Sequence, residues 1–365
     1  MLEKILQLCK IFQIQGEFCG FNEVGDGHVN STYRVRFSNG GKEESYILQK
    51  INTYVFKEPV QVMENISSVT EFIRVKLESL GENPEQGVLR YQKKSTGESY
   101  HITENGEFWR CSHYIKNSLS ILRPDNAYIV EQSGRAFGEF QKYLFDYPVQ
   151  NLHIVIPHFH NTILRFSAFR EALENNLSGR KHLIADEIAG YFALEEVACE
   201  PYKMQIRREI PLRVTHNDTK TSNVLFDVDT QERLCVIDLD TVMPGLVAFD
   251  FGDAIRVGAN TAEEDEKDVE KVALDIEKYE AFTKGFLREV GEYLTDNEKR
   301  SLTLGAVAMT VECGVRFLTD YLNGDKYFRV HYPEHNLVRA RCQLALARDM
   351  LKNFDQMQEI VKKYC

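Results

Sequence analysis

The chain has 365 residues, 43% of them hydrophobic and 27% charged, the composition of a soluble globular protein of roughly two domains. Its net charge of −11 argues against a general nucleic-acid binder and against binding to an anionic membrane. No stretch approaches the roughly 20 apolar residues of a transmembrane helix, and the first residues suggest an amphipathic helix rather than a signal peptide. The eight cysteines are scattered singly, so we expect reduced thiols and a cytoplasmic protein.

The first 115 residues are expected to form a strand-rich region. An amphipathic helix at the start is followed by segments in which apolar and polar residues alternate. Pro59 begins a predicted helix that runs to about Leu80, with apolar residues at helical spacing. The order of elements is that of the N-terminal lobe of a kinase. The predicted strands are 17–24, 31–37, 45–49, 88–90, 100–102 and 107–115.

A loop with two glycines, Gly25-Asp26-Gly27-His28-Val29-Asn30, separates the first two strands. Such a loop can offer backbone N–H groups to phosphates. Gly25-x-Gly27 is only half of a nucleotide-binding signature, and a plain hairpin turn would explain it by itself. The third strand and the helix that follow favour nucleotide binding. The P-loop pattern is absent, because Gly41-Lys42 lacks the upstream Gly and the following Ser or Thr.

The third strand carries an unusual residue at its end. A kinase usually has a Lys there, which contacts the α- and β-phosphates. By strand alternation Gln49 falls at that position and Lys50 faces the other way. Either the cleft uses a neutral amide or the strand is shifted by one residue, and the sequence leaves both open. We assign Gly25, Gly27, Gln49 and Tyr114 to nucleotide binding.

The rest of the chain is dominated by helical patterns. The change near Tyr114 to Ser118 predicts two lobes, residues 1–115 and residues 116–365. We expect helices at about 125–145, 163–178, 184–206, 270–292, 296–323 and 335–363.

Residues 216–223, His-Asn-Asp-Thr-Lys-Thr-Ser-Asn, fit the catalytic-loop pattern His-x-Asp-x-x-x-x-Asn of protein-kinase-like phosphotransferases. Phosphoryl transfer needs a carboxylate to orient the attacking hydroxyl and accept its proton, and oxygen ligands to hold Mg²⁺ against the triphosphate. Asp218 suits the first role, and Asn223 with Asp238 suits the second. Lys220 could reach the γ-phosphate as a point charge.

Asp238 must be brought back to Asn223 by a turn of the chain. The apolar segments 224–226 and 234–237 flank a polar turn at 227–233, which predicts a hairpin. Because this hairpin follows Asn223 directly and ends at Asp238, both side chains could bind one cation.

A structural role would explain any one of these residues. His216 and Asp218 could cap a turn, and Asp238 could simply end a strand. Five such residues at these separations favour a kinase. Asp250-Phe251-Gly252-Asp253 contains the D-F-G metal motif of protein kinases, but it lies too far from Asn223 for a hairpin return. We therefore expect Asp250 to hold the loop beneath the site by bonding backbone amides.

Longer motifs together resemble a known family. The catalytic loop without the kinase Arg, Ile-Asp-Leu-Asp at 237–240, Pro244-Gly245 and the motif at 249–253 are similar to the aminoglycoside-phosphotransferase and choline-kinase superfamily of small-molecule kinases. Within it, the chain resembles the N-acetylhexosamine 1-kinases from about residue 17 to 350. The motifs that carry this resemblance are Gly25 to Tyr33, Arg213 to Lys220, Glu312 to Leu318 and Tyr332 to Arg339.

The resemblance implies ATP- and Mg²⁺-dependent phosphorylation of the anomeric hydroxyl of N-acetylglucosamine or N-acetylgalactosamine. It also implies an α+β, protein-kinase-like two-lobed fold, with a β-rich N-terminal lobe and an enlarged helical C-terminal lobe. Gln at the third-strand position is also found in this group. The expected partners are ATP and an N-acetylhexosamine, without nucleic acid or membrane, and we expect a monomer.

The sugar pocket is assigned to residues from both lobes. A neutral hexosamine needs bidentate hydrogen bonds to ring hydroxyls and an apolar surface under its N-acetyl group. Arg316 has apolar neighbours that suggest an inward orientation, although an i,i+4 ion pair with Asp320 would also explain it. The resemblance favours a sugar role for Arg316, for Tyr327, and for His28 and Asn30 at the glycine loop.

Two other functions stay open. One is another alcohol kinase of the superfamily, acting on homoserine, methylthioribose or an aminoglycoside. The other is a nucleotide-binding pseudokinase without catalysis, which would require Asp218, Asn223 or Asp238 to be missing. All three are present.

Overall fold

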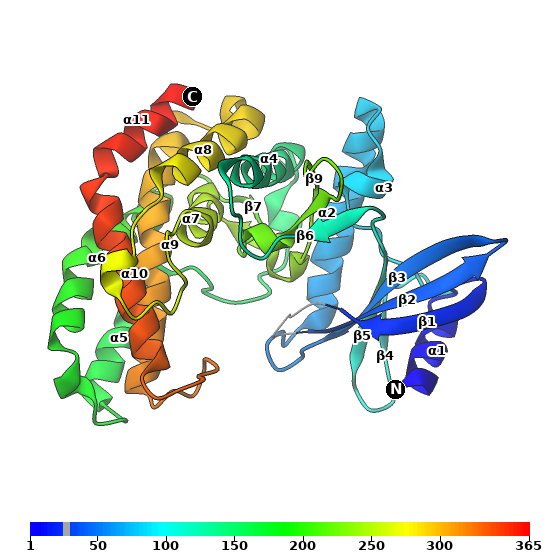
Figure 1. The fold of residues 1–365 in the computed structure, drawn as a ribbon, viewed down its shortest axis with the longest axis horizontal. Coiled ribbons are helices and arrows are strands. Elements are labelled where there is room, and N and C mark those ends of the chain that lie inside the picture. The colour runs from blue at the N-terminus through cyan, green and yellow to red at the C-terminus, as the bar shows by residue number, and fades with distance from the viewer. Residues whose placement is uncertain (25–29) are drawn as a thin grey trace.

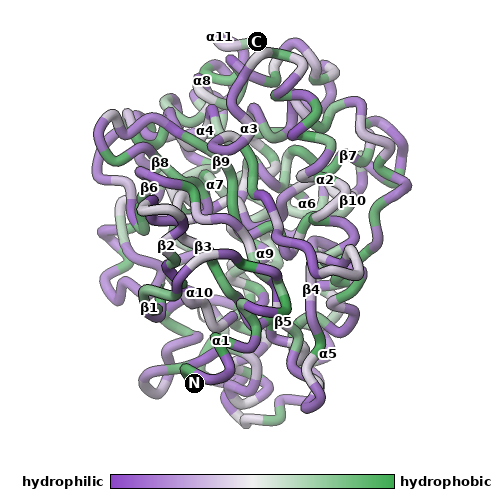
Figure 2. Tube along the Cα trace, turned by 90° about the vertical axis from the view of Figure 1, so that its right-hand side faces the viewer, coloured by the Kyte–Doolittle hydropathy of each residue, from purple (hydrophilic) through white to green (hydrophobic). Residues whose placement is uncertain are grey.

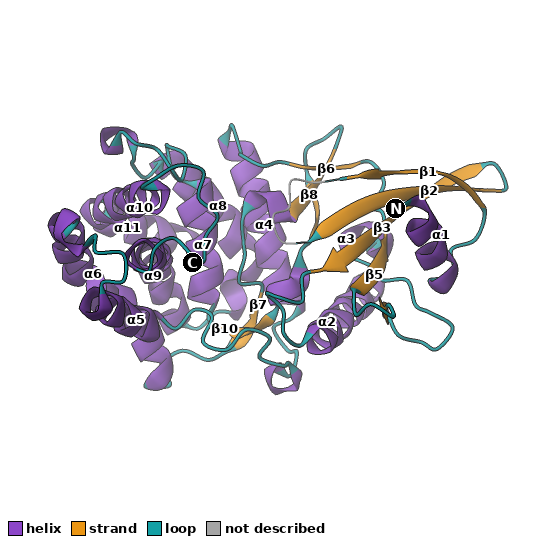
Figure 3. Ribbon diagram, turned by 90° about the horizontal axis from the view of Figure 1, so that it is seen from below, coloured by secondary structure: helices purple, strands orange, loops and turns teal. Residues whose placement is uncertain are grey.

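The computed structural model describes residues 1–24 and 30–365, and its larger sheet lies at one end of the molecule while most of its helices lie at the other (Figures 1 and 3). The larger sheet is antiparallel and has the strand order β1-β2-β3-β5-β4. A long helix, α2 (Pro59–Leu80), runs between this sheet and the helical region (Figure 1). The five strands are β1 (Glu17–Glu23), β2 (Ser31–Asn39), β3 (Lys42–Ile51), β4 (Tyr100–Ile102) and β5 (Phe108–His113).

The two faces of this sheet differ in chemistry because side chains alternate along each strand. On one face, the first helix α1 (Leu2–Ile11) buries its apolar side chains against Val35, Leu48 and Trp109. On the other face, Gln49 and Arg110 lie opposite each other in the register of β3 and β5. This second face also carries Ile51 and Phe108, which are buried in the core that includes α2, and it is directed toward the helical region.

The helical region is built around α9, whose apolar residues are buried on nearly all sides. α9 is also, among the described residues, the one helix long and apolar enough to cross a membrane, but 78% of its apolar window is buried inside the protein. Purple, hydrophilic segments prevail in the outer loops of Figure 2. The helices are α3 (Pro84–Gly87), α4 (Ala127–Tyr143), α5 (Thr162–Asn175), α6 (Ala185–Ile206), α7 (Val247–Gly258), α8 (Ile276–Val290), α9 (Asp296–Leu322), α10 (His335–Lys352) and α11 (Phe354–Tyr364).

Short strands next to the helices flank the catalytic loop at residues 216–223. The predicted hairpin is confirmed as β8 (Val224–Asp227) and β9 (Arg233–Val236), and β6 (Ser118–Ser120) pairs with β8. β7 (Arg213–Thr215) leads into the catalytic loop and pairs with β10 (Met243–Gly245). The α+β fold with a strand-rich N-terminal region and a helical C-terminal region is thus confirmed, while the lobe boundary at 115/116 stays a prediction.

The structure corrects two predicted elements and adds one helix. Segment 88–90 is not a strand, because the chain enters it from the short helix α3 and forms only one isolated bridge, between Tyr91 and Ser112. The predicted helix 335–363 is two helices, α10 and α11, separated at Asn353. Helix α7 was not predicted at all, since its sequence had been interpreted only as a motif.

Two glycines let α7 and α9 touch along their backbones. A Cβ atom on Gly252 would lie 2.2 Å from the carbonyl oxygen of Gly305, and one on Gly305 would lie 2.0 Å from the carbonyl oxygen of Ala248. Any side chain at these positions would force the helices apart. The crossing matters for function because α7 carries Asp250 and Asp253, which lie beneath the catalytic loop.

We predict that Gly305→Ala lowers the free energy of unfolding by about 1–3 kcal/mol, the usual cost of overpacking a core. Gly258→Ala is the matched control. It lies in the last turn of α7, where an added Cβ would come no closer than 3.9 Å to another group, Thr221 Oγ1. The control should leave stability unchanged or raise it slightly, because Ala is the better helix former. Denaturant unfolding of both variants measures the difference, and equal losses would contradict the tight crossing.

Candidate active site

The catalytic loop between β7 and β8 surrounds the Asp218 carboxylate with donors. Its Oδ2 atom accepts hydrogen bonds from Lys220 Nζ at 2.8 Å and from Asn223 Nδ2 at 2.9 Å. Asn217 adopts a left-handed φ of 64°, a conformation that Asn tolerates better than most residues. The loop therefore holds three of the predicted site residues in direct contact.

Asp250 supports this loop from below. Its Oδ2 atom accepts from the backbone N–H of His216 at 2.9 Å, and its Oδ1 atom accepts from that of Asn217 at 2.8 Å. Gln141 donates a further bond of 2.7 Å to Oδ2, and Asp253 accepts from the N–H of Thr219 at 3.1 Å. These contacts confirm the prediction that Asp250 holds the catalytic loop by bonding backbone amides.

The hairpin β8–β9 returns Asp238 to the catalytic loop, as predicted. The N–H of Ile237 donates to the carbonyl oxygen of Asn223 at 2.8 Å, which fixes the two segments side by side. Asp238 follows in the left-handed region, with a φ of 61°. Within the described part of the chain, no hydrogen bond or ion pair reaches its carboxylate.

The two carboxyl groups differ in ionisation. Burial opposes the ionisation of Asp218, but Lys220, His216 and Asn223 outweigh it and hold the pKa of Asp218 below its usual value. Burial and the negative charges of Asp240 and Asp218 together raise the pKa of Asp238 to about 6, and the positive charges of Lys220 and Arg110 offset this rise only in part. Asp218 is thus the more readily ionised of the two carboxyl groups.

The side-chain oxygens of Asn223 and Asp238 are suitable ligands for a magnesium ion. Asn223 uses its amide N–H group on Asp218, which leaves its amide oxygen available, and Asp238 offers a carboxylate without a protein partner among the residues described. No cluster of three or more His, Cys, Asp or Glu side chains suited to a metal occurs in residues 1–24 and 30–365. Mg²⁺ in phosphotransferases is often held by one or two protein oxygens together with substrate phosphates, so two ligands suffice.

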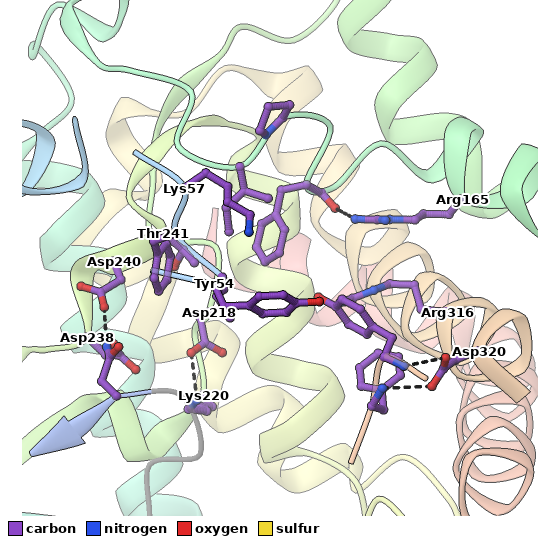
Figure 4. Close-up of a pocket in the computed structure, with 18 of the residues that line it drawn as sticks. Tyr54, Lys57, Arg165, Asp218, Lys220, Asp238, Asp240, Thr241, Arg316 and Asp320 are labelled. Atoms are coloured by element: carbon purple, nitrogen blue, oxygen red, sulfur yellow. Dashed lines mark hydrogen bonds and ion pairs between the residues drawn. The ribbon is translucent and has the colours of Figure 1, made fainter. Parts of the chain in front are cut away.

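A cavity of about 770 Å³ opens beside these residues and has two chemically different ends. In Figure 4, Asp218, Lys220, Asp238 and Asp240 lie at one side, and Arg165, Arg316 and Asp320 lie at the other. Tyr54 and Lys57, from the loop after β3, lie between them (Figure 4). The remaining wall of the second end is largely apolar or aromatic, with Ile156, Pro157, Phe159, Tyr327 and Phe328.

Arg316 lines this second end, as the sequence predicted, and Asp320 does not pair with it among the described contacts. The Asp320 carboxylate instead accepts from the backbone N–H groups of residues 326–328, at 2.9 to 3.0 Å, and from Asn336. These bonds fold the loop that carries Tyr327 over the end of α9. The guanidinium of Arg316 lies over the Phe328 ring, 5.4 Å from its centre, and is left to face the cavity.

A second arginine joins Arg316 at this end. Arg165 on α5 donates to the carbonyl oxygen of Phe159 at 2.6 Å, and its Nε atom has no hydrogen-bond partner in the described residues. Beneath it lies Glu312 of α9, 4.0 Å from that Nε atom and 3.0 Å from His160 Nδ1. Burial opposes the ionisation of Glu312, but the bond with His160 and the guanidinium charges keep its pKa below the usual value. His160 also lies 3.3 Å from the carbonyl oxygen of Asn217.

The nucleotide-binding residues expected from the sequence are only partly brought together. Gln49 lines the cavity, whereas Lys50 points to the other face of the sheet and pairs with Glu107 at 3.0 Å. The cleft thus contains the neutral amide, and β3 is not shifted. Tyr114 does not line this cavity, since its ring lies against the guanidinium of Arg34, so its assignment stays a prediction.

The glycine loop gives a mixed outcome. Gly25, Gly27 and His28 lie outside the described residues. Asn30 does line the cavity, but its Nδ2 atom donates to Asp240 at 2.7 Å and its Oδ1 atom accepts from the N–H of Asn52 at 2.9 Å. Its proposed contact with a sugar would have to replace or accompany these bonds.

Several residues of the cavity were missed by the sequence analysis. Asp240 stood two positions after Asp238, so a signal was present for it. Tyr54, Lys57 and Arg165 lie in segments without any recognisable pattern. Only the fold brings them to the same cavity.

Comparison with known proteins agrees with this geometry. Residues 123–286, which include the catalytic loop, the hairpin and α7, match the model of the phosphotransferase enzyme family. This match covers less than half of the chain. The match is to the part of the chain that carries the catalytic end of the cavity, and it stops before Arg316.

Solved phosphotransferase structures share the fold across nearly the whole chain. A microcompartment-associated aminopropanol kinase aligns with a TM-score of 0.59 and 11% identity, over 98% of this chain and 99% of its own. A spectinomycin phosphotransferase, in complex with ADP and spectinomycin, aligns with a TM-score of 0.54 and 14% identity, over 99% of this chain and 98% of its own. An ethanolamine kinase of Plasmodium vivax aligns with a TM-score of 0.52 and 13% identity, over 89% of this chain and 81% of its own. At these identities the likeness shows the kinase-like fold.

We predict that Asp238→Asn stabilises the ligand-free protein, and more so at about pH 7.5 than at about pH 5. The pKa of this acid is raised by folding from 3.8 to about 6, so its ionisation costs stability as the pH rises through that window. The amide removes the cost. Thermal melts of both proteins at both pH values measure it, with Asp229→Asn in the exposed hairpin turn as control. A gain that did not grow with pH would contradict the unpaired carboxylate.

Proposed function

We propose that this protein is an N-acetylhexosamine 1-kinase, which transfers the γ-phosphoryl group of ATP to the anomeric hydroxyl of N-acetylglucosamine or N-acetylgalactosamine. The observation that carries the proposal is the division of one cavity into two ends. One end has the acids of a phosphoryl-transfer site, and the other has arginines and aromatic rings. The family match supports the transferase chemistry, and the resemblance of the sequence motifs supports the sugar.

The second end suits a neutral, hydroxyl-rich acceptor. Guanidinium groups such as those of Arg165 and Arg316 can donate paired hydrogen bonds to vicinal hydroxyls. The rings of Tyr54, Tyr327 and Phe328 offer an apolar surface for a sugar face or an N-acetyl methyl group. Tyr54 and Tyr327 are 83% and 74% exposed, so an acceptor that packs between them would remove a large apolar area from water.

The catalytic roles follow from the contacts at the first end. Asp218 would accept a hydrogen bond from the attacking hydroxyl, hold its oxygen in line with the γ-phosphorus, and take the proton as the new bond forms. Lys220 would provide positive charge next to the transferred group. Asn223 and Asp238 would hold Mg²⁺, which neutralises charge on the phosphates when it is bound.

The charges at the second end disfavour a cationic acceptor. Lys57, Arg165 and Arg316 line it, and the nearby acids Asp320 and Glu312 are already bonded to protein groups. An aminoglycoside carries several ammonium groups and would meet like charges there, which costs binding energy. Methylthioribose and homoserine carry no net positive charge, so this argument does not exclude them and the panel of acceptors has to include them.

The assignment is tested by incubating the protein with ATP and Mg²⁺ and a panel of acceptors, and identifying products by phosphorus NMR. The panel contains N-acetylglucosamine, N-acetylgalactosamine, methylthioribose, homoserine and an aminoglycoside. A doublet of a sugar 1-phosphate from an N-acetylhexosamine is the expected result. Transfer to another acceptor would indicate a different small-molecule kinase of the superfamily, and nucleotide binding without transfer to any acceptor would indicate a pseudokinase.

We predict that Asp218→Asn lowers turnover by roughly 10²–10⁴ while nucleotide binding changes little, because the shape is kept and the base is lost. Steady-state kinetics with the preferred acceptor and a separate ADP titration provide the two readouts. Asp229→Asn, a similar change in the exposed turn of the adjacent hairpin, is the control. Retention of most of the activity would remove Asp218 from the catalytic role.

We predict that Arg316→Lys raises the sugar KM at least about tenfold with little effect on the KM for ATP, since Lys keeps the charge and loses the planar donor pair. The exposed Arg329, in the same loop as Tyr327 but not in the cavity wall, gives the control Arg329→Lys. An unchanged sugar KM would take Arg316 out of the acceptor site.

A further inference from the structure

Arg110 and Asp240 form an ion pair between the N-terminal sheet and the loop that carries Asp238. Arg110 lies on the face of β5 opposite α1 and is 2% exposed, and Asp240 is 3% exposed. Nη1 of Arg110 contacts Oδ1 of Asp240, while its Nε and Nη2 atoms donate to Gln49 Oε1 at 2.9 and 2.6 Å. The other oxygen of Asp240 accepts from Asn30 at 2.7 Å. The carboxylate of Asp240 therefore joins β5 and Asn30, the last residue of the glycine loop, to the segment that carries Asp238.

Stability alone is a weak reason for this arrangement. Removing two charges from water is costly, and a buried ion pair is often no better for stability than packed apolar side chains of similar size. Buried pairs do fix which groups meet and at what distance. Here the pair joins segments 130 positions apart in the sequence, and one partner stands two residues from Asp238.

The same contacts explain how the cleft works without a lysine at the end of β3. Gln49 is neutral, and Lys50 points away to Glu107 on the α1 side of the sheet. Arg110 comes from the neighbouring strand, directly opposite Gln49 in the register, and its guanidinium is held by the Gln49 amide oxygen. The cation of this part of the sheet is thus supplied by β5.

We propose that Arg110 and Asp240 act as a clamp of positioning residues, which holds Asp238 at the distance from the sheet that metal-bound nucleotide requires. The clamp rests on the proposed kinase function. Arg110 does not line the cavity, and Asp240, which does, has both of its oxygens bonded to protein donors. We therefore assign both as positioning residues. They act through Asp238 and through the separation of the two regions.

The clamp makes a specific prediction for nucleotide binding. Titrating ADP into the wild-type protein by calorimetry, in Mg²⁺ and then in EDTA, gives the part of the affinity that depends on metal. The double variant Arg110→Met with Asp240→Leu replaces the pair by apolar side chains and should still fold. It should lose roughly 10–100-fold of the metal-dependent affinity, the usual effect of losing a partner that orients a metal ligand.

A conservative change and a matched control complete the test. Arg110→Lys keeps a cation next to Asp240 and should restore part of the lost affinity. Lys50→Met removes an ion pair from the same two strands on the opposite face of the sheet, so it should change stability only. The kcat of the double variant should fall while its acceptor KM stays near that of the wild type, because the acceptor end of the cavity is not touched.

Each outcome has one meaning. Wild-type protein that binds no ADP would refute the proposed function, whatever the variants do. Wild-type protein that binds ADP with metal dependence, together with a folded double variant or Arg110→Lys variant of unchanged dependence, would overturn the clamp and leave the kinase assignment standing. A stronger metal dependence in the variants would show that the pair restrains Asp238 in an unproductive position, which also overturns the clamp.

Discussion

The catalytic loop keeps its shape because one buried carboxylate, Asp250, bonds two adjacent backbone N–H groups beneath it. A buried N–H group without an acceptor is costly, so these bonds determine which conformation of His216 and Asn217 is stable. Asn217 then enters the left-handed region, and the chain turns to present Asp218. Asp250 can be there only because α7 lies directly against α9, where Gly252 and Gly305 leave room for the contact. Packing deep in the helical region thus sets the geometry of the reacting groups.

The fold places acidic side chains at one end of the cavity and basic side chains at the other. Asp218 pairs with Lys220 and Asp240 with Arg110, while the partly buried carboxyl group of Asp238 has no hydrogen-bond or ion-pair partner among the described residues. The raised pKa of Asp238 means that its ionisation costs stability in the ligand-free protein. At the other end the balance is reversed, since cationic groups face the cavity and their acidic neighbours are occupied by backbone amides or by His160.

The sheet separates structural tasks from functional ones by the simple alternation of its strands. Leu48 and Trp109 face α1 and form an apolar core, and Gln49 and Arg110 face the helical region. A shift of one residue in β3 would exchange these faces, placing Lys50 in the cleft and an apolar residue beside it. The pairing of β3 with both β2 and β5 fixes the register and excludes that alternative.

Much of this molecule could be predicted from local patterns. Helix 59–80, the catalytic-loop spacing and the hairpin that returns Asp238 to Asn223 all depend on residues close together in the sequence, where periodicity and turn chemistry act. The contacts of Asp250 with backbone amides were also predicted, and the side chain that faces the cleft from the end of β3 was narrowed to Gln49 or Lys50. The motif at 249–253 was recognised, but the helix α7 that carries it was not predicted.

Only the tertiary structure decided the partners of the buried charges. Asp320 could have paired with Arg316 one turn away, yet it bonds three backbone N–H groups of the following loop, which leaves Arg316 to the cavity. Arg110 and Asp240, and likewise Arg165 and Glu312, are far apart in the sequence and carry no motif that links them. The sequence determines which residues can ionise and which segments form strands or helices. Which charges meet is decided by packing, because a charge is tolerated in the interior only where the fold brings it a partner.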